Sequence, residues 1–322
     1  MQGSGSRPCK GVTRVLQNAG AVGRRLALAL GFGLISLFFS EFFFLNEAPV
    51  LAVLEGENHV AFFLEFTLYY ALFAYLALVV MGSGGRQDAV GLILGGATLG
   101  WAIEALVIPL AYEAPPLSFA WPSLGWHLVV VFGLGWVALG RMRRRWPAAW
   151  QGLAYLALGV IWTGWARLFW VEDPELVLPD VGGFAVYTVV TTALYGIGAW
   201  IVDRPGLHMT ATGGDRIAAA AMAVPLFAMM GWSVWPWALA LGGLWGLTLL
   251  ALRRSPRVAP DAGDPAPPAG AYLASLALPI GAAVSFALLP DAPAGLSFLV
   301  ILPLTALGTG ALVWALWRGL MR

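Results

Sequence analysis

Residues 26–49 read LALALGFGLISLFFSEFFFLNEAP, and this stretch decides the fold class. Its first 14 letters contain no charged side chain, and the apolar run continues past Glu41 to Asn46 and Glu47. About 20 consecutive apolar residues are enough for a helix to cross the hydrocarbon core of a bilayer. The stretch therefore predicts a membrane-spanning helix that carries one carboxyl group inside the span and another at its end.

The composition extends this interpretation to the whole chain. Of the 322 residues, 60% are hydrophobic and only 11% are charged, whereas soluble domains carry about 25% charged residues. Apolar runs recur along the sequence, which predicts an all-α, polytopic helical bundle embedded in the lipid bilayer. The formal net charge is +1, and no basic motif is present, so we expect no nucleic-acid partner. The sequence leaves homo-oligomerisation open.

About ten spans, arranged as five helical hairpins, account for the apolar runs. We expect them at residues 25–45, 60–81, 89–111, 124–140, 148–170, 183–202, 217–232, 235–252, 271–289 and 296–317.

The same pattern divides the chain into five parts. They are an N-terminal tail (1–24), a six-helix core (25–202), a helical hairpin (203–252), a Pro/Ala-rich linker (253–270) and a C-terminal hairpin (271–322). Acidic residues precede Pro at several outer turns, for example Glu47-Ala-Pro49 and Asp291-Ala-Pro293. These turns fit either a duplicated ancestral hairpin or the usual preference of Pro and acidic residues for helix starts.

The distribution of charge predicts the orientation. With the N-terminus in the cytoplasm, all Lys and Arg residues of the loops fall on the inner side and the outer loops are acidic, as the positive-inside rule requires. We therefore expect a multi-pass protein of a bacterial-type inner membrane with both termini in the cytoplasm. The single cysteine, Cys9 in the tail, excludes an intrachain disulfide.

Five ionisable side chains lie inside or near the predicted spans, where a charge is costly and by default indicates a functional or paired site. At about 1.5 Å per residue, all five fall in the outer half of the membrane. They are Glu41, Glu65, Glu104, His127 and Arg167.

Helical spacing indicates which neighbours these groups have. Glu104 continues the face of Gly96 and Gly100 at i, i+4 and i+8, so it should face protein rather than lipid. Tyr69 follows Glu65 by four residues and can donate a hydrogen bond to it. The sixth span carries a stripe of hydroxyl groups that includes Tyr187 and Thr191.

The candidate binding residues are therefore Glu41, Glu65, Tyr69, Glu104, His127, Arg167, Tyr187 and Thr191. Arg167 could neutralise a glutamate, with Glu104 as the favoured partner, or bind an anionic group of a substrate. An unpaired, desolvated glutamate could carry a proton. Two alternatives involve no binding site. Glu104 and Arg167 could form an ion pair that only fixes helix packing, and His127 could belong to an interfacial aromatic belt.

A divalent cation held by Glu65, Glu104 and His127 is a further alternative. The sequence contains no HExxH, CxxC or HxxxH spacing, so we predict no metal site, and nothing identifies a cofactor or a catalytic residue.

Three functional hypotheses follow. The favoured one is a transporter or permease for a small solute or ion, with a carboxylate-lined, outward-facing site. The others are an enzyme acting on a lipid at the outer leaflet, for which no nucleophile motif is present, and a scaffold that uses the polar groups for helix specificity. The last four spans carry no ionisable residue in their interior, which suggests a structural or lipid-facing wing.

Overall fold

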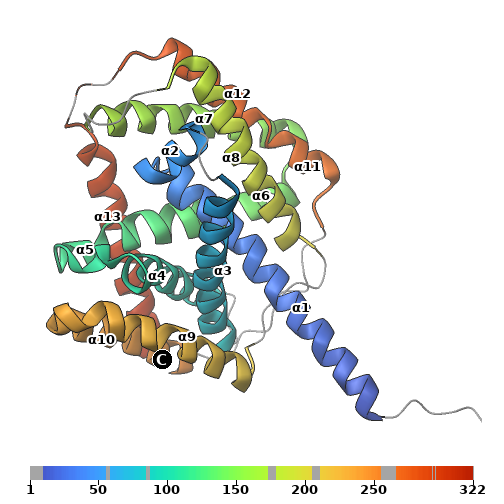
Figure 1. The fold of residues 1–322 in the computed structure, drawn as a ribbon, viewed down its shortest axis with the longest axis vertical. Coiled ribbons are helices and arrows are strands. Elements are labelled where there is room, and N and C mark those ends of the chain that lie inside the picture. Colours follow the sequence, from blue (N-terminus) through green and yellow to red (C-terminus); the bar gives the residue numbers. More distant parts are fainter. Residues whose placement is uncertain are drawn as a thin grey trace, which may run out of the picture.

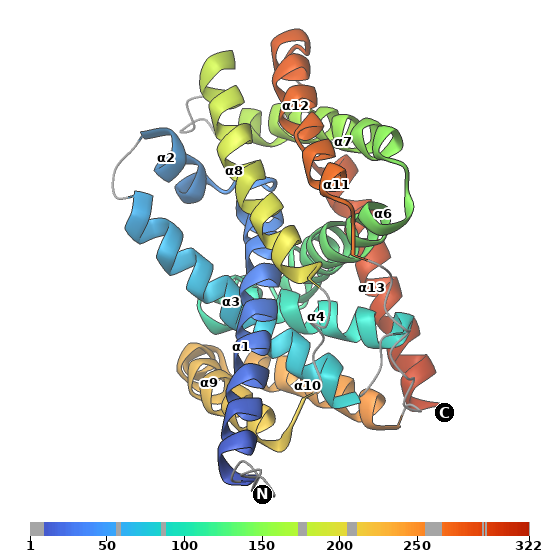
Figure 2. The same cartoon turned by 90° about the vertical axis from the view of Figure 1, so that its right-hand side faces the viewer.

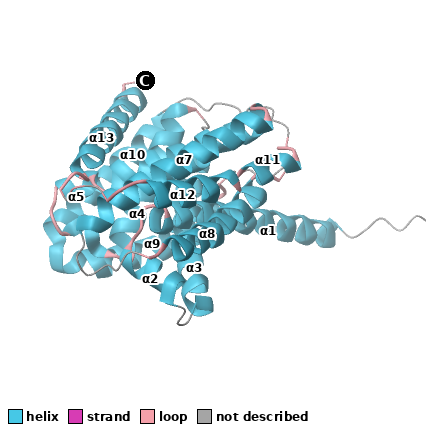
Figure 3. Ribbon diagram, turned by 90° about the horizontal axis from the view of Figure 1, so that it is seen from above, coloured by secondary structure: helices cyan, strands magenta, loops and turns pink. Residues whose placement is uncertain are grey.

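The computed structural model describes residues 10–55, 59–84, 88–172, 179–204, 211–254, 266–291, 293 and 295–321. The first nine residues, with Cys9, and residues 255–265 of the linker lie outside this part of the chain, as do the outer-loop residues Glu57, Asp173 and Glu175. Within the described residues every regular element is a helix and none is a strand (Figure 3).

The described residues of the first half of the chain form nine helical elements. They are α1 (Lys10–Leu37), the π-helix η1 (Phe38–Phe42), α2 (Glu47–Glu55), α3 (His59–Gly84), α4 (Ala89–Leu106), the 3-10 turn η2 (Pro109–Tyr112), α5 (Leu117–Ala120), the π-helix η3 (Ser123–Ala138) and α6 (Leu139–Arg145).

The second half forms nine more. They are α7 (Ala148–Phe169), the 3-10 turn η4 (Trp170–Glu172), α8 (Val181–Val202), α9 (Gly213–Gly231), the 3-10 turn η5 (Trp232–Val234), α10 (Trp235–Arg254), α11 (Ala269–Ala274), α12 (Ala277–Leu288) and α13 (Phe298–Leu320).

Figure 1 shows α7 and α12 together at one end of the molecule and α9 and α10 at the opposite end, with α3 and α4 between them. The N-terminal part of α1 extends away from the body, while the C-terminal part packs against α3 and α8. In the turned view of Figure 2, α8 lies beside α12. The centre of the molecule is therefore formed by α1, η1, α3, α4 and η3.

Nine helical segments of the described residues are long and apolar enough to cross a membrane, so the chain is an integral membrane protein. The number of segments is nine rather than ten because residues Gly213–Arg254 count as one continuous helical segment. The turn η5 divides it into α9 and α10, which fold back on each other. The rings of Phe227 and Trp245 lie 5.2 Å apart, and a Cβ atom at Gly231 would lie 2.6 Å from Cβ of Ala238. The hairpin explains why the sequence predicts about ten spans.

Neighbours in the sequence are not always neighbours in space. α1 packs on α3, and α4 packs on η3, as expected for hairpins. In contrast, α12 lies between α7 and α8 and contacts both. α13 packs on η3 and α4, where a Cβ atom at Gly308 would lie 2.4 Å from the carbonyl oxygen of Leu124. α12 therefore belongs to the packed body, whereas α13 and the segment Gly213–Arg254 are the least buried of the apolar helical segments, as expected of a lipid-facing part of the protein.

Side-chain contacts near the helix ends join segments that we predict to lie on the same side of the membrane. On the predicted inner side, Arg25 of α1 binds Asp215 at the start of α9 at 3.1 Å, and Arg143 binds Asp203 at 2.7 Å. These pairs agree with a chain that crosses the membrane in alternating directions. The cytoplasmic location of the termini stays a prediction.

The predicted outer side has equivalent contacts. Glu172, just after α7, accepts hydrogen bonds from the backbone N–H of Gly295 and from both the backbone and the hydroxyl group of Ser297, the N-cap of α13. These donors hold the pKa of the Glu172 carboxyl below its usual range. Glu172 thereby ties the end of α7 to the start of α13.

The crossing of α7 and α12 depends on two glycines. A Cβ atom at Gly159 would lie 2.2 Å from the carbonyl oxygen of Leu278, and one at Gly281 would lie 2.3 Å from that of Leu156. Because the obstructing atoms belong to the backbone, a side chain at either position forces the helices apart.

We predict that Gly159→Ala destabilises the protein by about 1–3 kcal/mol, the usual range for overpacking. Gly164→Ala on the same helix is the control, because a Cβ atom there meets nothing within 4 Å and Ala is the better helix former. Thermal unfolding of the purified protein in detergent measures both. Equal unfolding temperatures for the two variants would contradict the packing described for α12.

Candidate functional site

The candidate site is built on two π-helices. In η1 the N–H of Phe43 donates to the carbonyl oxygen of Phe38, five residues earlier, at 2.7 Å. Ser40 and Glu41 lie on η1, and His127 lies on η3. Single π-turns inside α-helices occur frequently at functional sites, because they re-aim side chains.

Side chains from three other helices hold η1 and the residues that follow it in place. Trp126 donates to the carbonyl oxygen of Phe39 at 2.9 Å, and Tyr187 donates to that of Phe42 at 2.7 Å. Trp165 donates to the carbonyl oxygen of Phe44 at 2.8 Å. The irregular backbone is thus buried in protein, as it must be at membrane depth.

A strained residue closes the segment. Leu45 has φ of 73°, a left-handed conformation that costs a branched side chain about 1–2 kcal/mol. It lets the N–H groups of Leu45 and Asn46 both donate to the carbonyl oxygen of Glu41, at 2.9 and 3.0 Å. The turn brings the Asn46 amide back onto the Glu41 side chain. Strain of this kind tends to be kept where a site needs a particular geometry.

Glu41 is buried, with 4% of its surface exposed. Its Oε2 accepts a hydrogen bond from Nδ2 of Asn46 at 2.6 Å, and its Oε1 accepts one from the hydroxyl group of Tyr70 on α3. Both donors are neutral groups.

Glu104 of α4 pairs with His127 of η3. Oε1 of Glu104 and Nε2 of His127 lie 2.5 Å apart, and both side chains are buried. The approach depends on Gly100, one turn before Glu104, because a Cβ atom there would lie 1.9 Å from the carbonyl oxygen of Ser123. The second oxygen of Glu104, Oε2, is buried and has no hydrogen-bond partner.

Ser40 connects the two carboxyl groups. Its Oγ lies 3.1 Å from Nδ1 of His127, and its hydroxyl group also interacts with that of Tyr70. The result is a continuous set of five side chains, which we call the carboxyl relay: Glu41, Tyr70, Ser40, His127 and Glu104.

The donation from Tyr70 to Glu41 is consistent with one arrangement of the protons in the carboxyl relay. The single hydroxyl proton of Tyr70 is donated to Glu41. In this arrangement the hydroxyl group of Ser40 donates to the Tyr70 oxygen, and Nδ1 of His127 donates to the Ser40 oxygen. Nε2 of His127 and Glu104 then share one proton, and their pair is neutral overall.

A cavity of about 200 Å³ adjoins one end of the carboxyl relay. Glu41 and Tyr70 line its inner wall, and Glu65 and Tyr69 lie on the more exposed helix face of α3. The remaining lining residues are Phe66, Phe73, Ile103, Val107 and Ile108.

The structure brings together most of the residues that the sequence singled out. Glu41, Glu104 and His127 belong to the carboxyl relay, and Glu65 and Tyr69 lie at the adjoining cavity. The hydrogen bond predicted from Tyr69 to Glu65 is present at 3.0 Å.

The predicted pairing of Arg167 with Glu104 is wrong. Arg167 instead donates to Asp291 and, at 2.6 Å, to the carbonyl oxygen of Phe286. The reason is the position of α12, which packs directly against α7 and supplies a partner nearer than α4.

The hydroxyl stripe of α8 does not reach the cavity. Tyr187 donates to the backbone of η1, and Thr191 donates to the carbonyl oxygen of Tyr187 on its own helix at 2.7 Å. Tyr187 positions Glu41 through the backbone, whereas Thr191 has only a helix-internal role.

Sequence reasoning missed Tyr70, Ser40 and Asn46 as members of the site. Tyr70 follows Tyr69 directly and lies about 100° around the helix from it, so only the position of η1 shows which tyrosine meets Glu41. Asn46 follows Glu41 by five residues, a spacing that fits a π-turn rather than an α-helix.

Among the described residues, no group of three or more His, Cys, Asp or Glu side chains is arranged to hold a metal ion. The divalent-cation alternative, with Glu65, Glu104 and His127 as ligands, therefore has no geometric basis in this part of the chain.

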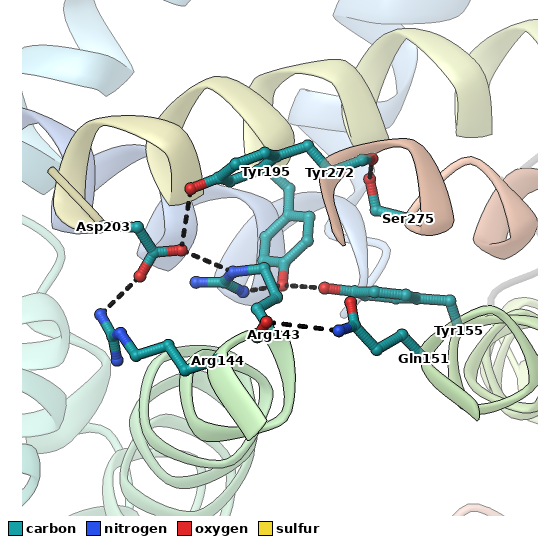
Figure 4. Close-up of polar contacts among 8 residues, drawn as sticks. All are labelled: Arg143, Arg144, Gln151, Tyr155, Tyr195, Asp203, Tyr272 and Ser275. Carbon is teal, nitrogen blue, oxygen red and sulfur yellow. Dashed lines mark hydrogen bonds and ion pairs between the residues drawn. The ribbon is translucent and has the colours of Figure 1, made fainter. Parts of the chain in front are cut away.

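A second buried polar cluster, shown in Figure 4, lies on the predicted inner side. Asp203 binds Arg143 at 2.7 Å and Arg144 at 2.5 Å. Arg143 also donates to the hydroxyl group of Tyr195 at 2.6 Å, and Tyr195 is hydrogen-bonded to Tyr155 at 2.9 Å. This cluster joins α6, α7 and α8.

No known protein family, curated protein or solved structure matches this chain. The functional argument therefore rests on the site itself.

Double-mutant cycles distinguish the two pairings of Glu104. We predict that Glu104→Ala and His127→Ala are non-additive, with a coupling free energy of about 1–3 kcal/mol, because each change leaves the other buried group without its partner. The cycle of Glu104→Ala with Arg167→Ala is the control, and its effects on the free energy of unfolding should add. Coupling in the Arg167 cycle, and none in the His127 cycle, would contradict the site.

Proposed function

We propose that the protein is a proton-coupled permease for a small solute or ion, with the carboxyl relay as its proton site. The observation that carries the proposal is the position of Glu41, which is both a wall of the cavity and one end of the relay. A solute in the cavity and a proton in the relay thus act on the same carboxyl group.

The relay can move a proton without moving any heavy atom far. Glu104 gives its proton to Nε2 of His127, Nδ1 gives its proton to Ser40, Ser40 passes one to Tyr70, and Tyr70 passes one to Glu41. At His127, Ser40 and Tyr70 one bond to hydrogen breaks and one forms, whereas Glu104 only loses an O–H bond and Glu41 only gains one, so the net change is one proton transferred from Glu104 to Glu41. Every hydrogen bond then points the other way.

The proposal places the protein in a bacterial-type inner membrane with both termini in the cytoplasm and the cavity toward the outer side. A scaffold would need the polar groups only to fix helix packing, which does not require a cavity at Glu41. An enzyme acting on a lipid at the outer leaflet would use the same carboxyl groups for acid–base chemistry. In that case the cavity would bind its substrate without moving protons across the membrane.

The test uses purified protein in liposomes that contain a pH-sensitive dye and carry an imposed pH gradient. We predict that at least one of four added probes, benzyltrimethylammonium, sodium, acetate or glycerol, collapses the gradient faster with the wild type than in protein-free liposomes, which acetate crosses unaided as acetic acid. Glu41→Gln and Glu104→Gln should each abolish the effect, because an amide cannot take up the transferred proton.

The matched control is Glu113→Gln, which removes an exposed outer-loop carboxylate that belongs neither to the relay nor to the lining of the cavity and should retain wild-type proton movement. Two results would contradict a permease. One is that no probe moves protons in the wild type. The other is that the folded Glu41→Gln and Glu104→Gln variants move them as fast as the wild type does.

A further inference from the structure

The lining of the cavity beside the relay indicates the class of solute. Two of its nine lining residues, Glu41 and Glu65, are carboxylic acids, and none is Lys, Arg or His. Charged side chains in a site with apolar walls produce a strong local potential. The cavity therefore attracts cations and repels anions.

Aromatic rings make up much of the remaining wall. Phe66, Tyr69, Tyr70 and Phe73 line the cavity from α3, and the faces of such rings attract organic cations. Ile103 of α4 and Val107 and Ile108, which follow that helix, complete the lining. This side is suited to an apolar group and offers nothing to a hydrated ion.

The hydrogen bonds of Glu41 disfavour a bare metal ion. Each of its oxygens already accepts one hydrogen bond, from Asn46 or Tyr70, and no group of three or more His, Cys, Asp or Glu side chains in the described part of the chain is arranged to complete a metal's ligand set. An organic cation needs no such coordination, because it is held by charge and ring contacts.

The volume limits the size of the ligand. About 200 Å³ is below the range of roughly 300–1,000 Å³ that is common for drug-sized ligands. It fits a body of one ring or a short alkyl chain joined to an ammonium group.

We propose that this cavity binds a small organic cation with an apolar body, and that the cation and the relay proton compete for Glu41. The proposal rests on the function proposed above and adds its substrate class and its direction of coupling. Protonation removes the charge that the cation needs, so uptake of a proton at Glu41 expels the cation. Transport is then an exchange of cation against proton.

Calorimetric titration of the purified protein in detergent tests the binding directly. The probe is benzyltrimethylammonium, with benzoate as the anionic and benzyl alcohol as the neutral counterpart. We expect binding of the cation alone, weaker binding at lower pH, and an affinity lower by about tenfold or more in Glu65→Gln and in Tyr69→Ala. Both residues are at the exposed face of α3, so their replacement leaves the core intact. Glu113→Gln should bind the cation as the wild type does.

The inference is overturned if benzoate or benzyl alcohol binds as tightly as the cation, or if Glu65→Gln and Tyr69→Ala leave the affinity unchanged. Its failure differs from failure of the permease. If the cation binds as expected but no probe moves protons in liposomes, the proposed permease function is refuted and the proposed cation-binding site is retained. If acetate or glycerol moves protons through the protein and the cation does not bind, the proposed permease function is retained and the organic cation is refuted as its substrate class.

Discussion

The structure depends on the free-energy cost of burying two carboxyl groups, Glu41 and Glu104, among helices that are otherwise apolar. A buried carboxylate without partners is strongly destabilising, so the surrounding helices have to supply donors. η1 brings Asn46 back onto Glu41, α3 supplies Tyr70, and η3 supplies His127. The π-helical backbone and the left-handed Leu45 are understandable as consequences of this requirement.

The same requirement explains several features of packing. Gly100 lets α4 approach η3 so closely that Glu104 reaches His127. The carbonyl groups of η1 are bonded by Trp126 and Tyr187, which fixes Glu41 relative to both helices. A site held by backbone contacts of this kind is rigid, which suits a relay whose protons move between atoms already within hydrogen-bond distance.

Helix content, membrane insertion and the protein-facing direction of Glu104 could be predicted from the sequence, because each depends on composition or on spacing within one helix. The partner of Arg167 could not, since it depends on α12 packing against α7, a contact between segments about 120 residues apart. Tyr70 was missed for a related reason. The i+4 rule identifies Tyr69 as the neighbour of Glu65, but only the tertiary position of η1 selects Tyr70 for Glu41.

The two buried polar clusters are separated by aromatic side chains. The Tyr195 ring of the inner cluster lies 5.4 Å from Phe38 and 5.7 Å from Phe39, directly before Ser40 of the carboxyl relay. A proton or solute that passes from one cluster to the other must cross this layer. The two clusters are therefore not joined by a continuous chain of polar side chains among the described residues.

The central claim is that the carboxyl relay holds a proton on one of its two glutamates. Infrared spectroscopy of the purified protein tests it most directly, because a protonated carboxyl group has a C=O stretching band that a carboxylate lacks. The account predicts this band at neutral pH in the wild type and in Glu113→Gln, and its loss in Glu104→Gln. A spectrum without the band at neutral pH, or one that keeps it in both Glu41→Gln and Glu104→Gln, would contradict the account.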